Sequence, residues 1–188
     1  MSLFEFILAL YVVLAGLGLT LLVRSVGQII EARSRVKLYW VHTAWLGFTF
    51  LTHVSSWFLV WSFRDVASWT VGEFLLLVSV PTVLYLVSHV SVPEIPEDDS
   101  THDMRTYYYA RCRLILGLLG ATIVLNIANE SFLLDRFELT RLNAFRLTAL
   151  AALVVGFATP RPRVHAAVVG FLMLTLIAGL YVLDVRLT

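Results

Sequence analysis

Two pairs of polar residues lie inside long apolar runs and have the chemistry to bind a small cation or pass a proton. Asn126 and Glu130 are four residues apart, and Asn143 and Arg146 are three apart, so each pair shares one helix face. Ionisable side chains within hydrocarbon are costly and usually face a bundle interior or water. In a helical hairpin, Asn126 would lie level with Arg146 and Glu130 level with Arg141. We therefore expect the two polar faces to meet.

Other polar residues fall in the same half of the membrane, and they are His53, Glu73 and Asn129. The functional interpretation is an outward-facing vestibule in which Glu5, Glu73 and Glu130 favour cations while Arg146 balances their charge. The alternative is that these side chains only clamp helices together through hydrogen bonds. A neutralising substitution at Glu73 or Glu130 would change permeation under the first interpretation only.

One helix face carries His42, His53, Trp57 and Trp61, because a spacing of eleven residues and then four returns to nearly the same direction. One interpretation is a proton path gated by the indole rings. The other is a packed helix face whose histidines bond to backbone carbonyls. Pro81, in the middle of another apolar run, predicts a kink that leaves a carbonyl unpaired and could act as a hinge.

Three histidines, His42, His89 and His165, fall near the ends of different apolar runs on one side of the membrane. Neutral imidazole binds zinc, copper and haem iron, so a metal or bis-histidine haem site is one hypothesis. No Cys-x-x-Cys or His-x-x-x-His spacing accompanies them. Interfacial histidines with a pH response are the alternative, and we expect no cofactor.

These residues must be positioned by membrane-spanning helices. The chain is 59% hydrophobic and 14% charged, whereas soluble domains are near 25% charged. Apolar runs of about 20 residues match the bilayer when helical, and only helices satisfy their backbone within one segment. The composition therefore predicts an all-α polytopic bundle. Six spans are expected, at 3–23, 38–63, 67–90, 108–134, 139–158 and 164–183.

The distribution of Lys and Arg predicts the orientation in an inner (plasma) membrane. Nine of the 14 basic residues lie in or beside the first, third and fifth loops, and these are Arg24, Arg33, Arg35, Lys37, Arg105, Arg111, Arg113, Arg161 and Arg163. The positive-inside rule places these loops in the cytoplasm and both termini outside.

The third loop divides the chain into two halves of three spans, 1–92 and 107–188, joined by an acidic cytoplasmic linker at 93–106. The linker contains two prolines and is expected to be extended. Residues 71–77 resemble residues 169–174, which indicates a weak 3+3 inverted repeat of the kind found in transporters.

No nucleophile elbow, pair of catalytic carboxylates, zinc-protease helix or phosphate-binding loop is present, so we expect no enzyme. No basic stripe is dense enough to track phosphates, so we expect no binding of nucleic acid. The leading hypothesis is a small channel or transporter for a cation or proton. Small residues four apart, at 117 and 121 and at 152 and 156, let helices approach closely in the lipid bilayer, either within the chain or between chains. The leading hypothesis includes assembly as a homo-oligomer. The alternatives are a membrane sensor or accessory subunit that docks a cytoplasmic partner, and a haem-binding electron-transfer protein.

Overall fold

Six helices long and apolar enough to cross a membrane make up most of this computed structural model. The structure describes residues 3–95, 101–134 and 140–182. The helices are α1 (Leu3–Glu31), α2 (Trp40–Val60), α3 (Val71–Ser91), α4 (Met104–Leu133), α5 (Arg141–Ala158) and α6 (Pro162–Val182). The predicted all-α membrane-spanning bundle is confirmed.

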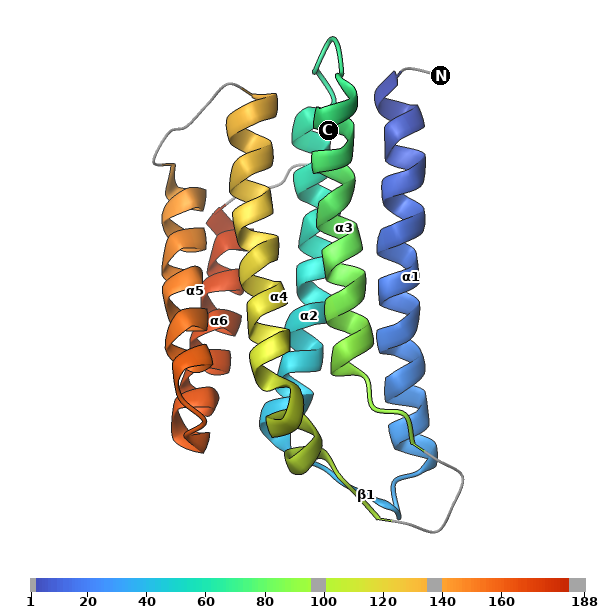
Figure 1. Ribbon diagram of the computed structural model, residues 1–188, viewed down its shortest axis with the longest axis vertical. Coiled ribbons are helices and arrows are strands. Elements are labelled where there is room, and N and C mark those ends of the chain that lie inside the picture. Colours follow the sequence, from blue (N-terminus) through green and yellow to red (C-terminus); the bar gives the residue numbers. More distant parts are fainter. Residues whose placement is uncertain (1–2, 96–100, 135–139, 183–188) are drawn as a thin grey trace.

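The helices run up and down side by side (Figure 1). Helix α3 packs against both α1 and α4, and α5 packs against both α4 and α6. Helix α2 lies behind them and contacts α6 and α3. In a 3+3 repeat, α1 would correspond to α4 and α3 to α6. The two halves pack differently, because α1 packs along α3, whereas α4 and α6 each pack on α5. This arrangement gives the weak inverted repeat no support, and the repeat stays a prediction.

Local capping signals shift several span boundaries from their expected positions. Helix α2 ends in a 3₁₀ turn at Trp61–Phe63, and α3 begins only at Val71. The Thr70 side chain accepts from the backbone N–H of Glu73, whose carboxylate accepts from the N–H of Thr70 in return. Such a capping box fixes a helix start. Glu73 therefore lies in the first turn of α3, and not two turns into it as a span beginning at residue 67 would require.

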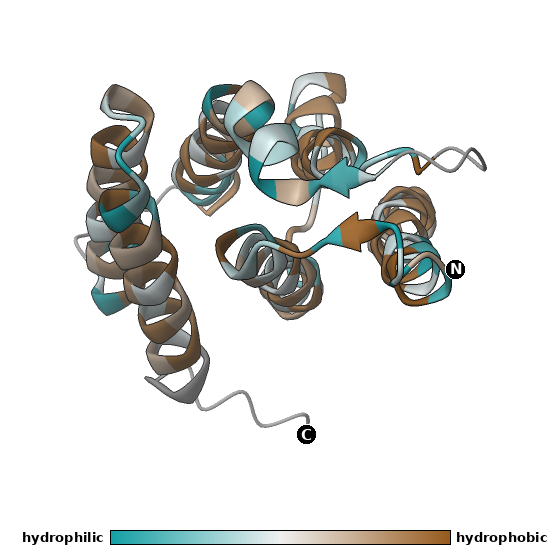
Figure 2. Ribbon diagram, turned by 90° about the horizontal axis from the view of Figure 1, so that it is seen from below, coloured by the Kyte–Doolittle hydropathy of each residue, from teal (hydrophilic) through white to brown (hydrophobic). Residues whose placement is uncertain are grey.

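A short parallel pairing closes one end of the bundle. Strand β1 (Val36–Lys37) pairs with β2 (His102–Asp103) and so joins the first loop to the third (Figure 2). Helix α4 starts directly after β2, at Met104. The acidic linker is therefore shorter than the predicted 93–106, because its last residues form β2 and the first turn of α4. Residues 96–100 of the linker lie outside the described residues.

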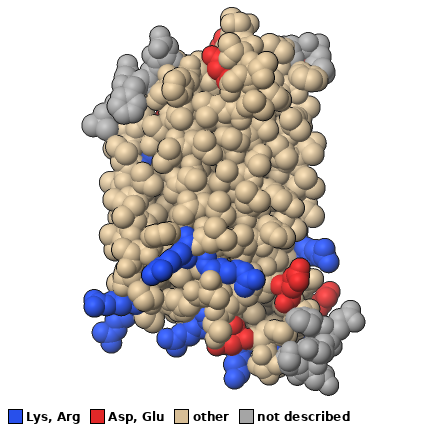
Figure 3. All heavy atoms as spheres, viewed as in Figure 1, with Lys and Arg blue, Asp and Glu red and all other residues tan. Residues whose placement is uncertain are grey.

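Basic residues gather at this same end, which we call the basic end (Figure 3). An apolar core fills the basic end between α2, α4 and α6, where Trp45, Tyr108, Ile115 and Leu172 are fully buried. A second apolar cluster ties α1 to α2 and α3 at the opposite end. The half of the bundle opposite the basic end is thus tightly packed on its α1 side.

Helix α1 approaches α2 closely because Gly18 leaves room for a histidine. The imidazole of His53 lies against Gly18, and a Cβ at that position would overlap the ring. Gly16, two residues earlier, is exposed, and a Cβ added at this position would meet no neighbouring heavy atom within 4 Å. The two glycines therefore form a matched pair for measuring this contact.

We expect Gly18→Ala to lower the free energy of unfolding by about 1–3 kcal/mol, because the added methyl group must displace a buried ring. Gly16→Ala should leave it unchanged or raise it slightly, since alanine is the better helix former. Equilibrium unfolding in detergent micelles measures both. Equal effects of the two substitutions would contradict the close contact between α1 and His53.

The start of α4 depends on a carboxylate outside the membrane span. Asp103 accepts from the hydroxyl of Thr106 at 2.8 Å and from the backbone N–H of Arg105 at 3.0 Å. These hydrogen bonds hold the pKa of Asp103 below its usual range. A carboxylate with a depressed pKa stabilises the fold above its unfolded pKa and loses this effect as pH falls through the folded value.

The first turn of α4 should therefore open as pH falls below about 4. Hydrogen exchange at Arg105 and Thr106, corrected for its intrinsic pH dependence, should show protection at neutral pH and less protection in acid. Asp103→Ala should give the low protection at every pH. A first turn equally protected in acid and in the variant would argue against the cap.

Candidate functional site

A buried ion pair joins α4 to α5. Arg146 Nη1 lies 2.7 Å from Glu130 Oε2, and the two side chains are 9% and 18% exposed. The same nitrogen donates to Asn143 Oδ1 at 2.9 Å. The pair neutralises both charges where isolated ones would be costly.

The pairing differs from the one expected for a simple hairpin, in which Glu130 lies level with Arg141. Helical side chains lean toward the N-terminus of their own helix, and α4 and α5 are antiparallel. The side chains of Glu130 and Arg146 therefore lean toward each other and meet between the levels of their backbones. Arg141, at the start of α5, is exposed instead.

A cavity of about 130 Å³ lies beside this ion pair, bordered by α2, α4, α5 and α6, with Leu84 of α3 in its wall. Most of its lining is apolar. Its polar lining residues are Thr52, Ser55, Ser56, Thr122, Asn126, Arg146 and Thr175. The structure thus brings Asn126 and Arg146 to one cavity, with Glu130 and Asn143 bonded directly behind Arg146.

The hydroxyl groups in the cavity wall have already used their hydrogens. Thr52, Thr122 and Thr175 each donate to a carbonyl three or four residues earlier in their own helix, at 2.8–3.0 Å. Asn126 Nδ2 likewise donates to the carbonyl of Thr122 at 2.9 Å. A hydroxyl has one hydrogen and two lone pairs, and an amide oxygen only accepts. These four side chains therefore present acceptors to the cavity, and Arg146 presents donors.

The cavity is closed toward the basic end. Its lining residues Phe48, Leu119, Leu153 and Leu172 belong to the apolar core that fills that end. This core is closely packed, as its fully buried side chains show. Within the part of the chain that the structure describes, the cavity is a blind pocket in the half opposite the basic end.

Two predicted site residues lie away from the cavity and support helix α3. Glu73 holds the capping box and does not line the pocket. Asn129 Nδ2 donates to the carbonyl of Leu76 at 3.1 Å, about one turn before the buried Pro81, and Ser79 Oγ donates to the same carbonyl at 2.6 Å. Asn129 therefore clamps α4 to α3 near the proline, and the role of Pro81 as a hinge stays a prediction.

The stripe on α2 divides into a buried part and an exposed part. His53 is 1% exposed, whereas Trp57 and Trp61 are about half exposed. Ser88 donates its hydroxyl hydrogen to a carbonyl of α3, so its Oγ accepts from His53 Nε2 at 2.9 Å. His53 Nδ1 is then a buried acceptor without a partner among the described residues. The indole rings do not enclose His53, and a path gated by them finds no support.

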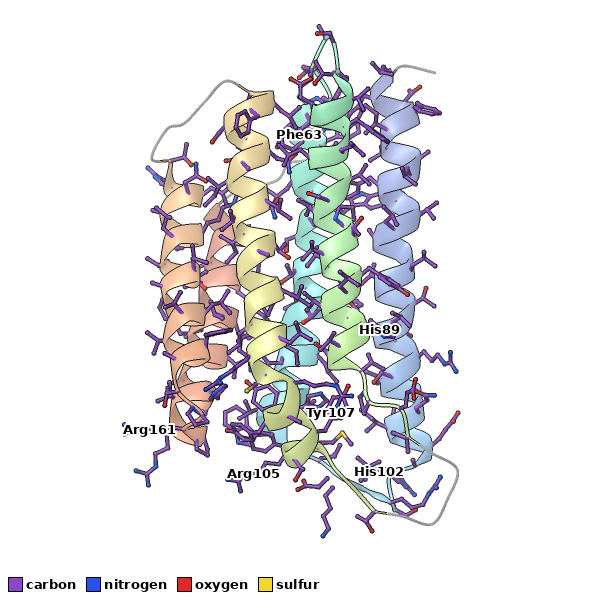
Figure 4. The ribbon with its side chains drawn as sticks, viewed as in Figure 1. Phe63, His89, His102, Arg105, Tyr107 and Arg161 are labelled. Carbon is purple, nitrogen blue, oxygen red and sulfur yellow. The ribbon has the colours of Figure 1, made fainter. Side chains whose placement is uncertain are left out.

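The three histidines of the metal or haem hypothesis do not converge. His42 Nε2 lies 2.9 Å from the carbonyl of Ser91, and His165 bonds to Tyr108 at 2.7 Å and to the carbonyl of Thr159 at 2.8 Å. His89 is exposed on α3 (Figure 4). Within residues 3–95, 101–134 and 140–182, no three His, Cys, Asp or Glu side chains are grouped to hold a metal ion.

Sequence reasoning missed the threonines and serines of the cavity wall. Thr122 lies four residues before Asn126, so its position on the same helix face was a usable signal. Thr52 and Thr175 carried no signal, because a lone hydroxyl in an apolar helix commonly bonds to its own backbone. The aromatic contacts around Tyr108 at the basic end were also missed, and they pack the helix ends together.

Comparisons of the chain with known protein families, with curated proteins and with solved structures gave no match.

Removing either member of the ion pair should be far more harmful than removing both. We expect Arg146→Met or Glu130→Leu alone to lower the free energy of unfolding by about 3–5 kcal/mol, because each leaves a buried charge unpaired. The double variant should recover most of this loss. A double-mutant cycle in micelles or nanodiscs measures the difference.

Arg141→Met is the matched control, because this arginine is exposed at the start of the same helix and its removal should cost about 1 kcal/mol or less. Additive losses in the double variant would show that Arg146 and Glu130 do not depend on each other, contrary to the structure.

Proposed function

We propose that this protein is a membrane transporter that receives a small solute in the cavity beside Arg146. The observation that carries the proposal is a partly polar pocket closed at one end by an apolar core. Transporters hold their solute near the middle of the bilayer and open to one side at a time. A blind pocket fits one of these two states, and passage would require the core around Leu153 and Leu172 to separate.

The direction of access follows from the charge distribution. Basic residues at one end of the bundle favour the cytoplasmic side of a plasma membrane, which places both termini outside. The cavity then faces the exterior, and the protein takes its solute from there. The gathering of Lys and Arg at one end supports this orientation (Figure 3).

The wall of the cavity supports a solute that carries positive charge or hydrogen-bond donors, because its hydroxyl and amide oxygens are acceptors. The acids expected to attract a cation contribute less, because Glu73 caps a helix and Glu130 is neutralised by Arg146. The acceptor oxygens of the threonines and of Asn126 take over that role in the proposal. A proton remains a candidate solute, because the same oxygens can accept hydrogen bonds from water molecules that carry it.

A membrane sensor or accessory subunit is the second candidate function. The exposed basic end supports it, since clustered Lys and Arg suit an acidic partner or an anionic lipid surface. Such a protein would bind a ligand or partner without moving solute. The haem hypothesis gains no support, because both ring nitrogens of His165 and Nε2 of His42 are bonded within the protein and His89 is exposed on α3.

Flux into proteoliposomes tests the transporter proposal. A panel of protons, Na⁺, methylammonium, alanine and lactate covers the solute chemistries that the wall admits. We expect at least one member to enter faster than into empty liposomes. Ala149→Trp, which fills the cavity, should reduce this flux by about tenfold or more, equivalent to about 1.4 kcal/mol.

Ala151→Trp is the matched control, because this residue lies on α5 but is exposed on the outside of the bundle. It should retain the flux. Folded protein that moves no member of the panel, or flux that survives Ala149→Trp, would overturn the proposal. The first result would favour the sensor or accessory subunit.

A further inference from the structure

We infer that the solute of this cavity is a small zwitterion with one carboxylate, one ammonium group and a short apolar body, that is, a small neutral amino acid. The inference rests on the proposed function of the cavity as a solute site. It combines three independent features of the wall: a paired guanidinium, a set of acceptor oxygens and an apolar floor.

The size of the cavity limits the solute first. A dry protein cavity of about 150 Å³ holds one benzene molecule, so about 130 Å³ accommodates about six non-hydrogen atoms. Alanine and serine are of this size, and phenylalanine is about twice as large. The cavity therefore matches a small amino acid better than a large amino acid, a sugar or a nucleotide.

The guanidinium supplies the site for a carboxylate. Arg146 lines the cavity, whereas its partner Glu130 does not. The printed contacts to Glu130 and Asn143 are both made by Nη1, which is one of the three guanidinium nitrogens. Arginine carries five donors in a planar fork that matches a carboxylate. A solute carboxylate can thus bind Arg146 while the structural ion pair stays intact.

The acceptor oxygens supply the site for an ammonium group. Thr52, Thr122 and Thr175 donate to their own helices, and Asn126 donates to the carbonyl of Thr122, so their oxygens accept only. An ammonium group has three donors and no acceptor, which complements such a wall. These acceptors line the cavity from three different helices, α2, α4 and α6, so an ammonium group can be contacted from more than one side.

The apolar floor receives the side chain of the solute. Phe48, Leu119 and Leu153 close the cavity toward the basic end and offer no hydrogen-bonding atoms there. A simple metal cation would leave this surface and Arg146 without partners. A monocarboxylate would leave the acceptor oxygens unpaired, and a site built for hydrogen bonds discriminates strongly against a ligand that lacks them.

Equilibrium binding of radiolabelled alanine to the purified full-length protein in nanodiscs tests the inference. We expect saturable binding that serine displaces, whereas lactate and ethylamine, each lacking one charged group, displace it at least about tenfold less well. Phenylalanine should not displace it. No saturable alanine binding, or equal competition by lactate or ethylamine, would overturn the inference.

Thr122→Val tests the acceptor wall in a variant that keeps its fold, because valine has nearly the same shape and leaves no donor unpaired. It should weaken alanine binding while leaving the weaker lactate binding unchanged. Thr20→Val is the matched control, since Thr20 also donates to its own helix, at 2.8 Å, but is exposed on α1. Equal losses in both variants would contradict the assignment.

The flux assay separates this inference from the proposed function. Alanine that binds but does not enter liposomes would refute transport and retain the ligand class. Another solute that enters by a route blocked by Ala149→Trp, without alanine binding, would refute the ligand class and retain transport.

Discussion

The cost of a charge in hydrocarbon governs the most distinctive part of this bundle. The guanidinium of Arg146 carries a positive charge, so it needs a carboxylate wherever water is excluded. Glu130 supplies that carboxylate from the neighbouring helix at 2.7 Å, and Asn143 supports the same nitrogen from within α5. The position of α5 against α4, and hence the wall of the cavity, depends on this pair.

The same principle explains the other polar side chains of the spans. Hydroxyl groups in α2, α4 and α6 satisfy themselves on their own backbones, so they need no partner on another helix. Asn129 and His53 behave differently, because each bonds to α3 and fixes it against its neighbours. Helix α5 is tied to α4 by the ion pair, and α6 is tied to α4 by the hydrogen bond between Tyr108 and His165.

Much of this arrangement could be predicted from the sequence. Run length and composition give six helices, and the spacing of Asn126, Glu130, Asn143 and Arg146 places four polar residues on facing surfaces. To predict that Glu130 pairs with Arg146, one must also consider the direction in which helical side chains lean, because residue spacing alone does not give it. The capping role of Glu73 depended on where α3 begins, and Thr70 was a readable but overlooked signal. The convergence of lone threonines from three helices could not be predicted, because it depends on tertiary packing.

The central claim is that solute reaches the cavity from the side opposite the basic end and that the apolar core blocks it from the other. A cysteine at position 122, in a Cys112→Ala background, reports this access directly through a membrane-impermeant thiol reagent applied to sealed vesicles of either orientation. The account predicts that the reagent modifies Thr122→Cys only from the side opposite the basic end, and that Ala149→Trp slows this modification. Modification from the side of the basic end, or from neither side, would contradict it.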